Sequence, residues 1–266
     1  MAAKTKIRKR AVTIRSASVA HSPLRASTLA LRGLTAIASK DVAAFTKRFF
    51  KTGVGEYGAG DRFLGIRLPA LRQFAGKMAK DVGGAGVEVA LPLLKSGWHE
   101  ARSLALILLV RQFQQGDPAT QETIYKLYLK NTKFINNWDL VDMSAEQIIG
   151  GWLADKPQKR KAVLATLAQS KSLWERRIAI LATFHAIKRG EYKETLRIAR
   201  MLLKDEEDLI QKAVGWMLRE VGKRVGLEPQ ETFLKRFYRQ MPRTMLRYAI
   251  ERFGEPKRKR YLLGLV

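Results

Sequence analysis

The sequence contains no cysteine, and this absence excludes disulfide bonds, thiol catalysis and thiolate metal ligands. Histidine is almost as scarce, because only His21, His99 and His185 occur and none has the HExxH spacing of a zinc helix. We therefore expect neither a metal nor a cofactor. No apolar run approaches the ~18 residues that a membrane helix needs. The chain is thus expected to be a soluble protein without a membrane partner.

Acidic residues are also few, with 24 Asp and Glu against 50 Lys and Arg, so the net charge is +26. An excess of this size points to a polyanionic partner, and nucleic acid is the commonest one for a soluble protein. An anionic membrane is the second choice, but no basic amphipathic helix with a Trp/Phe/Leu face stands apart from the fold. The partner we expect is nucleic acid.

Residues 1–35 hold no acid and are rich in Arg, Ser and Ala. This composition predicts a disordered basic arm that adds phosphate contacts, although Arg- and Ser-rich organelle transit peptides have the same character. Residues 36–266 are predicted to form a single domain. We expect a bacterial, cytoplasmic protein that associates with the nucleoid through DNA, with organelle targeting as the minor alternative.

From Ser39 onward the apolar residues recur with helical spacing, and no segment alternates as a strand does. The glycine-rich loop 53–61 lacks the GxxxxGK[ST] order of a phosphate-binding loop. The predicted fold is all-α. The predicted helices are 39–50, 69–80, 85–95, 98–115, 118–130, 136–153, 158–169, 172–188, 191–203, 207–223, 228–239 and 243–253.

The helices repeat along the chain. Residues 98–106 (WHEARSLAL) and 173–181 (LWERRIAIL) both open a helix with the pattern H/W-E-x-R, and a third copy begins near 211–216 (QKAVGW). If Arg102, Asp139, Arg177 and Lys212 are equivalent, the spacings between them are 37, 38 and 35 residues. Two helices per ~37 residues is typical of HEAT-like arrays. We therefore predict a right-handed solenoid of HEAT-like repeats with a concave basic cleft.

The stretch 136–142 (NNWDLVD) is the strongest candidate site. Trp138 and Asp142 are four residues apart, so on a helix they lie on one face, one turn apart. An indole face beside a carboxylate is suited to a cationic, planar group. A core tryptophan beside a solvated aspartate is the structural alternative.

Four windows of the sequence resemble the AlkD-like family of DNA alkylation repair glycosylases, which are HEAT-like-repeat proteins. They are 63–72, 137–142 (NWDLVD), 174–179 (WERRIA) and 211–220 (QKAVGWMLRE), within a resemblance that covers roughly residues 40–253. It implies hydrolysis of the N-glycosidic bond of cationic adducts such as 3-methyladenine and 7-methylguanine in duplex DNA, without base flipping. It also implies a monomer, and a DNA cleft lined by Trp138, Asp142, Trp216 and Arg177.

The resemblance is weaker in the first loop, where Tyr57 is the nearest candidate for the family's DNA-contacting tyrosine. Arg102, Lys212 and Arg219 are the further DNA contacts that we expect from the basic helices. Trp98, Trp152 and Trp174 are expected to be packing residues.

The chemistry of these residues agrees with the resemblance. A cationic purine leaves without a general acid, so the carboxylate of Asp142 is needed to stabilise the oxocarbenium-like sugar and align water. Trp138 and Trp216 can offer π faces, and Arg177 suits a phosphate. The alternatives are a structural ion pair for Arg177 and an inter-repeat filler for Trp216. At the level of function, the alternatives are a non-catalytic nucleic-acid-binding HEAT-repeat scaffold and a protein-binding scaffold.

Overall fold

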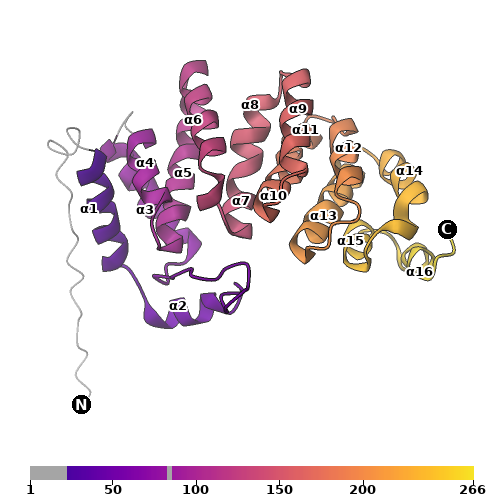
Figure 1. Cartoon of the computed structure of the whole chain (residues 1–266), viewed down its shortest axis with the longest axis horizontal. Helices are drawn as coiled ribbons and strands as arrows, with labels where there is room; N and C mark the ends of the chain where they lie inside the picture. The colour runs from indigo at the N-terminus through magenta and orange to yellow at the C-terminus, as the bar shows by residue number, and fades with distance from the viewer. Residues whose placement is uncertain (1–22, 83–85) are drawn as a thin grey trace, which may run out of the picture. The chain divides into compact units, whose positions relative to one another are not determined.

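The computed structural model describes residues 23–82 and 86–266, and every regular element within these ranges is a helix (Figure 1). The only β pairing in them is an isolated bridge between Arg62 and Trp98. The all-α prediction is therefore confirmed. None of the described helices is long and apolar enough to cross a membrane. The first 22 residues of the predicted arm lie outside the described residues.

The chain divides into two compact units, whereas we predicted a single domain from residue 36. Unit 1 comprises the residues up to Lys51 and Gly60–Leu108. Unit 2 comprises Thr52–Ala59 and Leu109–Val266. The glycine-rich loop is thus shared, because its first part, with Tyr57, belongs to unit 2.

Unit 1 begins with a packed helix where the sequence predicted disorder. Helix α1 packs on α4 and buries Ala26, Ala30 and Leu34. These small apolar residues recur every four positions and form one narrow stripe, so the short stretch 23–35 has a face to bury. The predicted arm is wrong for these residues. The helices of unit 1 are α1 (Pro23–Ala36), α2 (Lys40–Lys47), α3 (Leu68–Val82), α4 (Gly86–Leu94) and the first part of α5 (His99–Gln115).

The backbone of segment 64–66 is held in unit 1 by hydrogen bonds to a side chain and by a close approach to another backbone segment. The Glu100 carboxylate accepts hydrogen bonds from the N–H groups of residues 64, 65 and 66. Gly65 has a φ of 78°, and a Cβ there would lie 2.0 Å from the carbonyl oxygen of Ser39. Only glycine fits this approach. Ser39 itself caps α2, as predicted, by accepting from the N–H of Val42.

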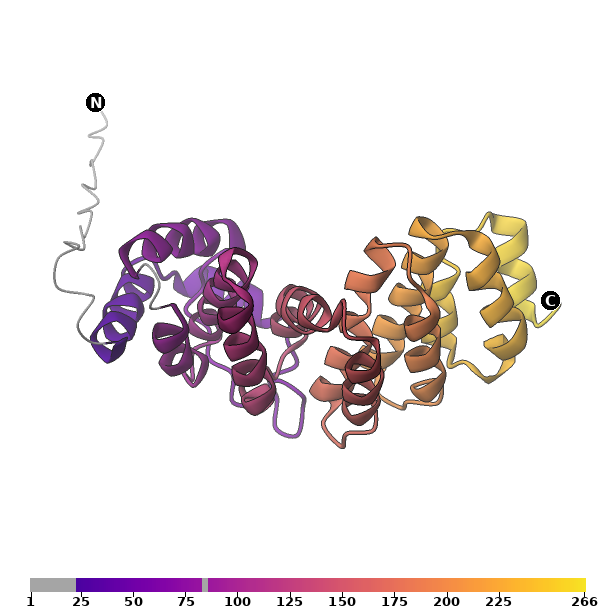
Figure 2. The same ribbon diagram turned by 90° about the horizontal axis from the view of Figure 1, so that it is seen from above.

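Unit 2 is built from two rows of helices, and each helix of the first row packs on the next helix of that row. Helix α7 packs on α10, α10 on α13, and α13 on α15, while α9, α12 and α14 form the second row (Figures 1 and 2). The elements of the first half are α6 (Pro118–Lys130), η3 (Thr132–Phe134), α7 (Trp138–Ala145), η4 (Glu146–Gly150), α8 (Gly151–Leu153), α9 (Pro157–Ala168), α10 (Leu173–Ala182) and α11 (Phe184–Lys188). Those of the second half are α12 (Lys193–Met201), α13 (Asp208–Arg224), α14 (Leu227–Phe237), η5 (Tyr238–Gln240), α15 (Arg243–Ala249) and α16 (Glu255–Leu263).

The repeat of unit 2 is regular. Helices α7, α10, α13 and α15 begin at residues 138, 173, 208 and 243, so each starts 35 residues after the last. The fifth residue of each helix is then Asp142, Arg177, Lys212 and Arg247. Our register was wrong at one point, because Asp142 and not Asp139 is equivalent to Arg177. The handedness of a solenoid and its concave cleft stay predictions.

Two glycines allow the repeats to approach closely. The predicted helix 136–153 contains a turn of π-helix, η4, and a Cβ on its Gly150 would lie 2.4 Å from the carbonyl oxygen of Ala182. A Cβ on Gly215 of α13 would lie 2.4 Å from the carbonyl oxygen of Met245 on α15. Larger residues at either position would force neighbouring helices apart.

Candidate active site

Helix α7 begins at Trp138, the third residue of the candidate stretch 136–142. The side-chain oxygen of Asn137, the N-cap residue, accepts a hydrogen bond from the Trp138 N–H at 2.8 Å. Leu140 and Val141 are fully buried and point into the core, whereas Trp138 and Asp142 are partly exposed. The helical period therefore leaves the indole and the carboxylate on the other face, as predicted.

The Asp142 carboxylate is bound by Arg177 across the two helices. The Nε and Nη2 groups of Arg177 donate to the two oxygens of Asp142 at 2.8 and 2.9 Å, and Nη1 donates to the carbonyl oxygen of Leu209. Arg177 thus connects α7, α10 and the start of α13. The pair forms because equivalent positions on adjacent helices of the repeat face each other. A planar guanidinium matches a carboxylate with two parallel hydrogen bonds.

The two partners of this pair differ in exposure. The side chain of Arg177 is 6% exposed, whereas that of Asp142 is 21% exposed. All three donor nitrogens of Arg177 are occupied within the protein. The structural ion pair that we considered as an alternative is therefore present. Arg177 serves first to orient Asp142, and the carboxylate is the group that remains open to a ligand.

Burial raises the pKa of Asp142 above its ordinary value, and the Arg177 guanidinium opposes this rise. The nearby negative charge of Asp139 contributes a smaller increase to the pKa of Asp142. Desolvation disfavours the charged carboxylate, while the bidentate pairing favours it. The result is a carboxylate whose charge is held in place by a buried cation.

Trp216 lies on α13, the next helix after α10 in the repeat. Its ring is half-buried, and its centroid lies 6.0 Å from that of Phe184. One side of the indole is thus packed between helices, while the residue keeps exposed surface. This geometry combines the packing role that we considered with a surface for a ligand.

The structure shows the surroundings of Tyr57, the residue that the sequence matched only loosely to the family's tyrosine. Its ring meets the ring of Trp174 edge-on, with centroids 5.7 Å apart. Trp174 is 8% exposed, in agreement with the predicted packing role. Tyr57 also lies close enough to raise the pKa of Lys212, although the hydrogen bond to Asp208 is the main cause of that shift. The tyrosine therefore belongs to the same face of unit 2 as the starts of α10 and α13.

The remaining predicted DNA contacts have different environments. Arg102 lies in unit 1, is 5% exposed and donates to Asp61 at 2.6 Å. A buried guanidinium paired with an aspartate has a structural role, and the DNA contact at Arg102 stays a prediction. Lys212 pairs with Asp208 at 2.6 Å and remains 39% exposed. The side chain of Arg219 is 20% exposed and pairs with Glu251.

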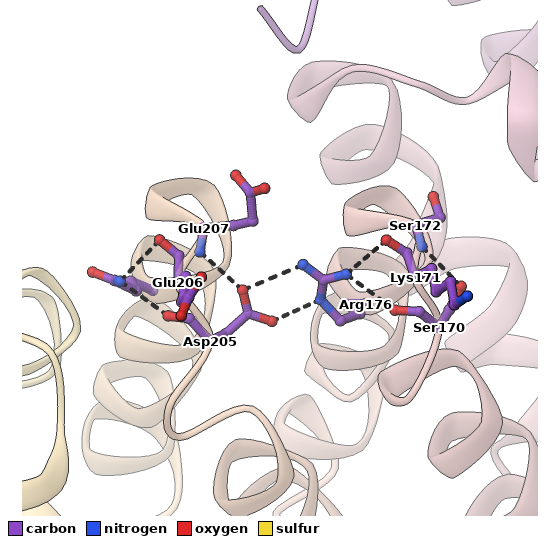
Figure 3. A network of polar contacts seen from close by, with 8 residues as sticks. Ser170, Lys171, Ser172, Arg176, Asp205, Glu206 and Glu207 are labelled. Carbon is purple, nitrogen blue, oxygen red and sulfur yellow. Dashed lines mark hydrogen bonds and ion pairs between the residues drawn. The ribbon is translucent and has the colours of Figure 1, made fainter.

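The sequence missed a polar network that joins adjacent repeats. The Nε and Nη2 groups of Arg176 donate to Asp205 at 2.7 and 3.4 Å, and its Nη1 donates to the carbonyls of Ser170 and Lys171 (Figure 3). This arginine ties the loop before α10 to the loop before α13. It holds in place the ends of the two helices that carry Arg177 and Lys212.

The glutamate shared by the two copies of the H/W-E-x-R pattern is a sequence signal for contacts between segments of the chain. Glu175 accepts hydrogen bonds from the hydroxyls of Thr132 and Ser170, each at 2.6 Å. Its counterpart Glu100 accepts from backbone N–H groups in unit 1. In both copies the glutamate binds an earlier segment of the chain, which explains why the pattern recurs.

Metal-ligating side chains are dispersed. Across residues 23–82 and 86–266, no three His, Asp or Glu side chains gather as a metal ion would require. His99 is buried, with its Nδ1 3.3 Å from the Asp61 carboxylate. His185 is half-buried on α11, and burial lowers its pKa. The charged pair at the candidate site is therefore Asp142 with Arg177.

Comparison with known proteins agrees with the sequence windows. The sequence model of a family described as "DNA alkylation repair enzyme" matches residues 30–253. A predicted DNA alkylation repair enzyme from Enterococcus faecalis has a similar solved structure, with a TM-score of 0.65 and 17% identity over 82% of this chain and 97% of that chain. The smu.31 protein of Streptococcus mutans UA159 has a TM-score of 0.51 and 18% identity over 71% and 93% of the two chains. No curated protein matches the sequence.

Proposed function

Because the chain belongs to the family of DNA alkylation repair enzymes, we propose that it is a DNA glycosylase that hydrolyses the N-glycosidic bond of cationic alkylated purines. The substrates would be lesions of the 3-methyladenine and 7-methylguanine type in duplex DNA. The observation that carries this proposal is the partly exposed carboxylate of Asp142, held in two hydrogen bonds by Arg177 and one helical turn from Trp138.

The proposed mechanism uses the charge of the lesion. An alkylated purine carries a positive charge on its ring, and the electron pair of the breaking bond neutralises that charge as the base departs. The sugar then develops oxocarbenium character, and a preorganised carboxylate stabilises it. Asp142 supplies this charge and can align the water that attacks the sugar carbon. Arg177 fixes the orientation of the carboxylate before substrate binds.

The two tryptophans would contact the DNA backbone at the lesion. Trp138 and Trp216 are both half-buried, so each ring is held by its helix while part of its surface stays accessible. Their π faces attract positive charge, which grows on the sugar in the transition state. Recognition through sugar and phosphate does not require an extruded base, so we propose excision without base flipping and tolerance of bulky cationic adducts.

The test is single-turnover release of base from a duplex that carries 7-methylguanine, at saturating enzyme. The variant Asp142→Asn keeps the shape of the side chain but removes its charge. One such electrostatic contact is worth ~3–4 kcal/mol, so the rate should fall by about a hundred- to a thousandfold while DNA affinity stays nearly unchanged.

Two controls make this test specific. Asp155→Asn removes an exposed carboxylate that pairs with Arg189 on the surface, and its excision rate should equal that of the unmodified protein. No uracil should be released from a matched duplex that contains it, because a neutral base needs an acid to depart. An Asp142 variant within a few-fold of the unmodified rate would exclude the proposed mechanism. DNA binding with no release of any base would favour the non-catalytic scaffold.

A further inference from the structure

Unit 2 contains a cavity that none of the predicted site residues lines. It has a volume of about 480 Å³ and lies between the C-terminal end of α12 and the junction of α14 with η5. This volume is within the range of small-molecule sites. Its lining residues are Arg200, Met201, Leu203, Lys204, Arg236, Phe237 and Gln240.

The lining contains three cations and no acid. The side chains of Arg200, Lys204 and Arg236 are exposed, and within the described residues none of them forms an ion pair with Asp or Glu. Residues 1–22 and 83–85, which the structure does not describe, contain no acidic residue. The three positive charges therefore converge on one cavity without compensation from a carboxylate.

Other described arginines of unit 2, such as Arg239, Arg243, Arg247 and Arg252, also form no ion pair with an acid, so the distinguishing feature of Arg200 and Arg236 is the cavity that they share. Between residues 157 and 237, which are all described, Arg200 and Arg236 are the two arginines without an acidic partner, and both line the same cavity. The arginines of this range that pair with an Asp or Glu are Arg160, Arg176, Arg177, Arg189, Arg197, Arg219 and Arg224.

An aromatic ring orients the two arginines. The guanidinium carbons of Arg236 and Arg200 lie 5.2 and 5.8 Å from the ring centroid of Phe237. A guanidinium held by a ring keeps its N–H edge available and loses less rotational freedom when it binds an anion. Gln240 adds an amide group to the same lining.

Helix dipoles explain part of this arrangement. Arg200 and Arg236 lie in the last turns of α12 and α14, where a cation interacts favourably with the C-terminal end of the helix. That effect accounts for one charge at each helix end. It does not account for the third cation, Lys204, or for the convergence of all three on a single cavity.

We propose that this cavity is a binding site for phosphate groups. A phosphate offers the oxygen acceptors that two guanidinium edges and an ammonium group can bind together. The phosphate could belong to the backbone of a DNA duplex or to a small phosphate-bearing molecule. The site shares no residue with the Asp142–Arg177 cluster and does not rest on the proposed glycosylase activity.

The first experiment measures binding of inorganic pyrophosphate by calorimetry at low ionic strength. The pocket variant is Arg200→Gln/Lys204→Gln/Arg236→Gln. The control variant is Lys159→Gln/Lys161→Gln/Lys193→Gln, which removes the same charge from exposed positions on α9 and α12. We expect one pyrophosphate site in the unmodified protein and in the control, and a loss of affinity of about tenfold or more in the pocket variant. Thermal unfolding of all three proteins verifies that they are folded.

The second experiment measures the salt dependence of binding to an undamaged duplex. If the slope of log K against log salt falls in the pocket variant by about 0.9 for each phosphate that is no longer bound, and does not fall in the control, the DNA backbone is the source of the phosphate. An unchanged slope with lost pyrophosphate binding identifies a small phosphate-bearing molecule. Equal pyrophosphate affinity in the pocket and control variants would overturn the proposal, whatever the excision activity.

Discussion

At the scale of single residues, two arginines with the same sequence signature have different surroundings. Arg102 and Arg177 both follow the H/W-E-x-R pattern, both are 5% exposed, and both bind an aspartate from an earlier segment. The difference lies in the partner, because the side chain of Asp61 is 5% exposed and that of Asp142 is 21% exposed. The exposure of the carboxylate, which only the structure shows, separates a structural pair from a candidate catalytic one.

The Asp142–Arg177 pair predicts a shift in pH dependence. Excision needs the charged carboxylate, so activity should be lost as the pH falls through the pKa of Asp142, which burial raises above the ordinary value of ~3.9. Arg177 opposes this rise. Arg177→Gln should therefore raise the pKa of Asp142 further and move the acidic limb of the excision rate to higher pH.

The pH–rate profile of single-turnover excision measures this limb. Arg177→Lys keeps the positive charge but loses the bidentate geometry, so its limb should lie closer to that of the unmodified protein. Because removal of a buried partner is strongly destabilising, both variants need a thermal unfolding control. If the limb of the Gln variant coincides with that of the unmodified protein, Arg177 does not act through the charge of Asp142.

At the scale of elements, the 35-residue repeat connects positions that are far apart in sequence. The fifth residues of α7, α10, α13 and α15 are Asp142, Arg177, Lys212 and Arg247, and these helices pack in that order. Arg177 is buried in its pair with the partly exposed Asp142, whereas Lys212 and Arg247 are more exposed than Arg177. Lys212 pairs with Asp208, whereas Arg247 forms no ion pair within the described residues, so Arg247 is the cation of this row that is available to a phosphate.

Arg247 is therefore predicted to contact the DNA backbone beside the lesion. Arg247→Gln should remove about one phosphate contact, so the slope of log K against log salt should fall by about 0.9 and affinity should drop several-fold. Single-turnover excision at saturating enzyme should stay unchanged. Lys161→Gln, on α9 in the other row of helices, is the matched loss of one exposed charge. Equal slopes for the two variants would place Arg247 outside the DNA interface.

At the scale of the whole molecule, the charge of +26 is spread over the chain and is not confined to one end. Residues 1–40 contribute nine cations and no acid. The rest of the chain holds 41 cations and 24 acids, so it still carries a net charge of +17. Non-specific attraction to DNA should thus persist when the N-terminal residues are removed, although it should weaken.

Deletion of residues 1–22 tests the contribution of the arm while it keeps α1, which is packed on α4. The deleted stretch holds Lys4, Lys6, Arg8, Lys9, Arg10 and Arg15. If these residues bind phosphates, the slope of log K against log salt on an undamaged duplex should fall by about 0.9 for each phosphate that the shortened protein no longer binds. An unchanged slope would favour a cleaved targeting segment or an inert tail.

The sequence by itself determined the properties that depend on neighbouring residues. Helical periodicity predicted the all-α fold and most of the helices, and it placed Trp138 and Asp142 on one face because four residues make about one turn. The windows at 137–142 and 211–220 predicted the family. Each of these features depends on residues within a short stretch of chain, so it can be predicted without knowing how the helices pack.

Only the tertiary structure decided the properties that depend on distant residues. It paired Asp142 with Arg177, buried Arg102 against Asp61, and brought Tyr57 to Trp174. These contacts join residues from 35 to 117 positions apart, and their existence depends on how helices pack. Burial then decided which charges are free and which are neutralised, because the cost of an unpaired buried charge selects its partner.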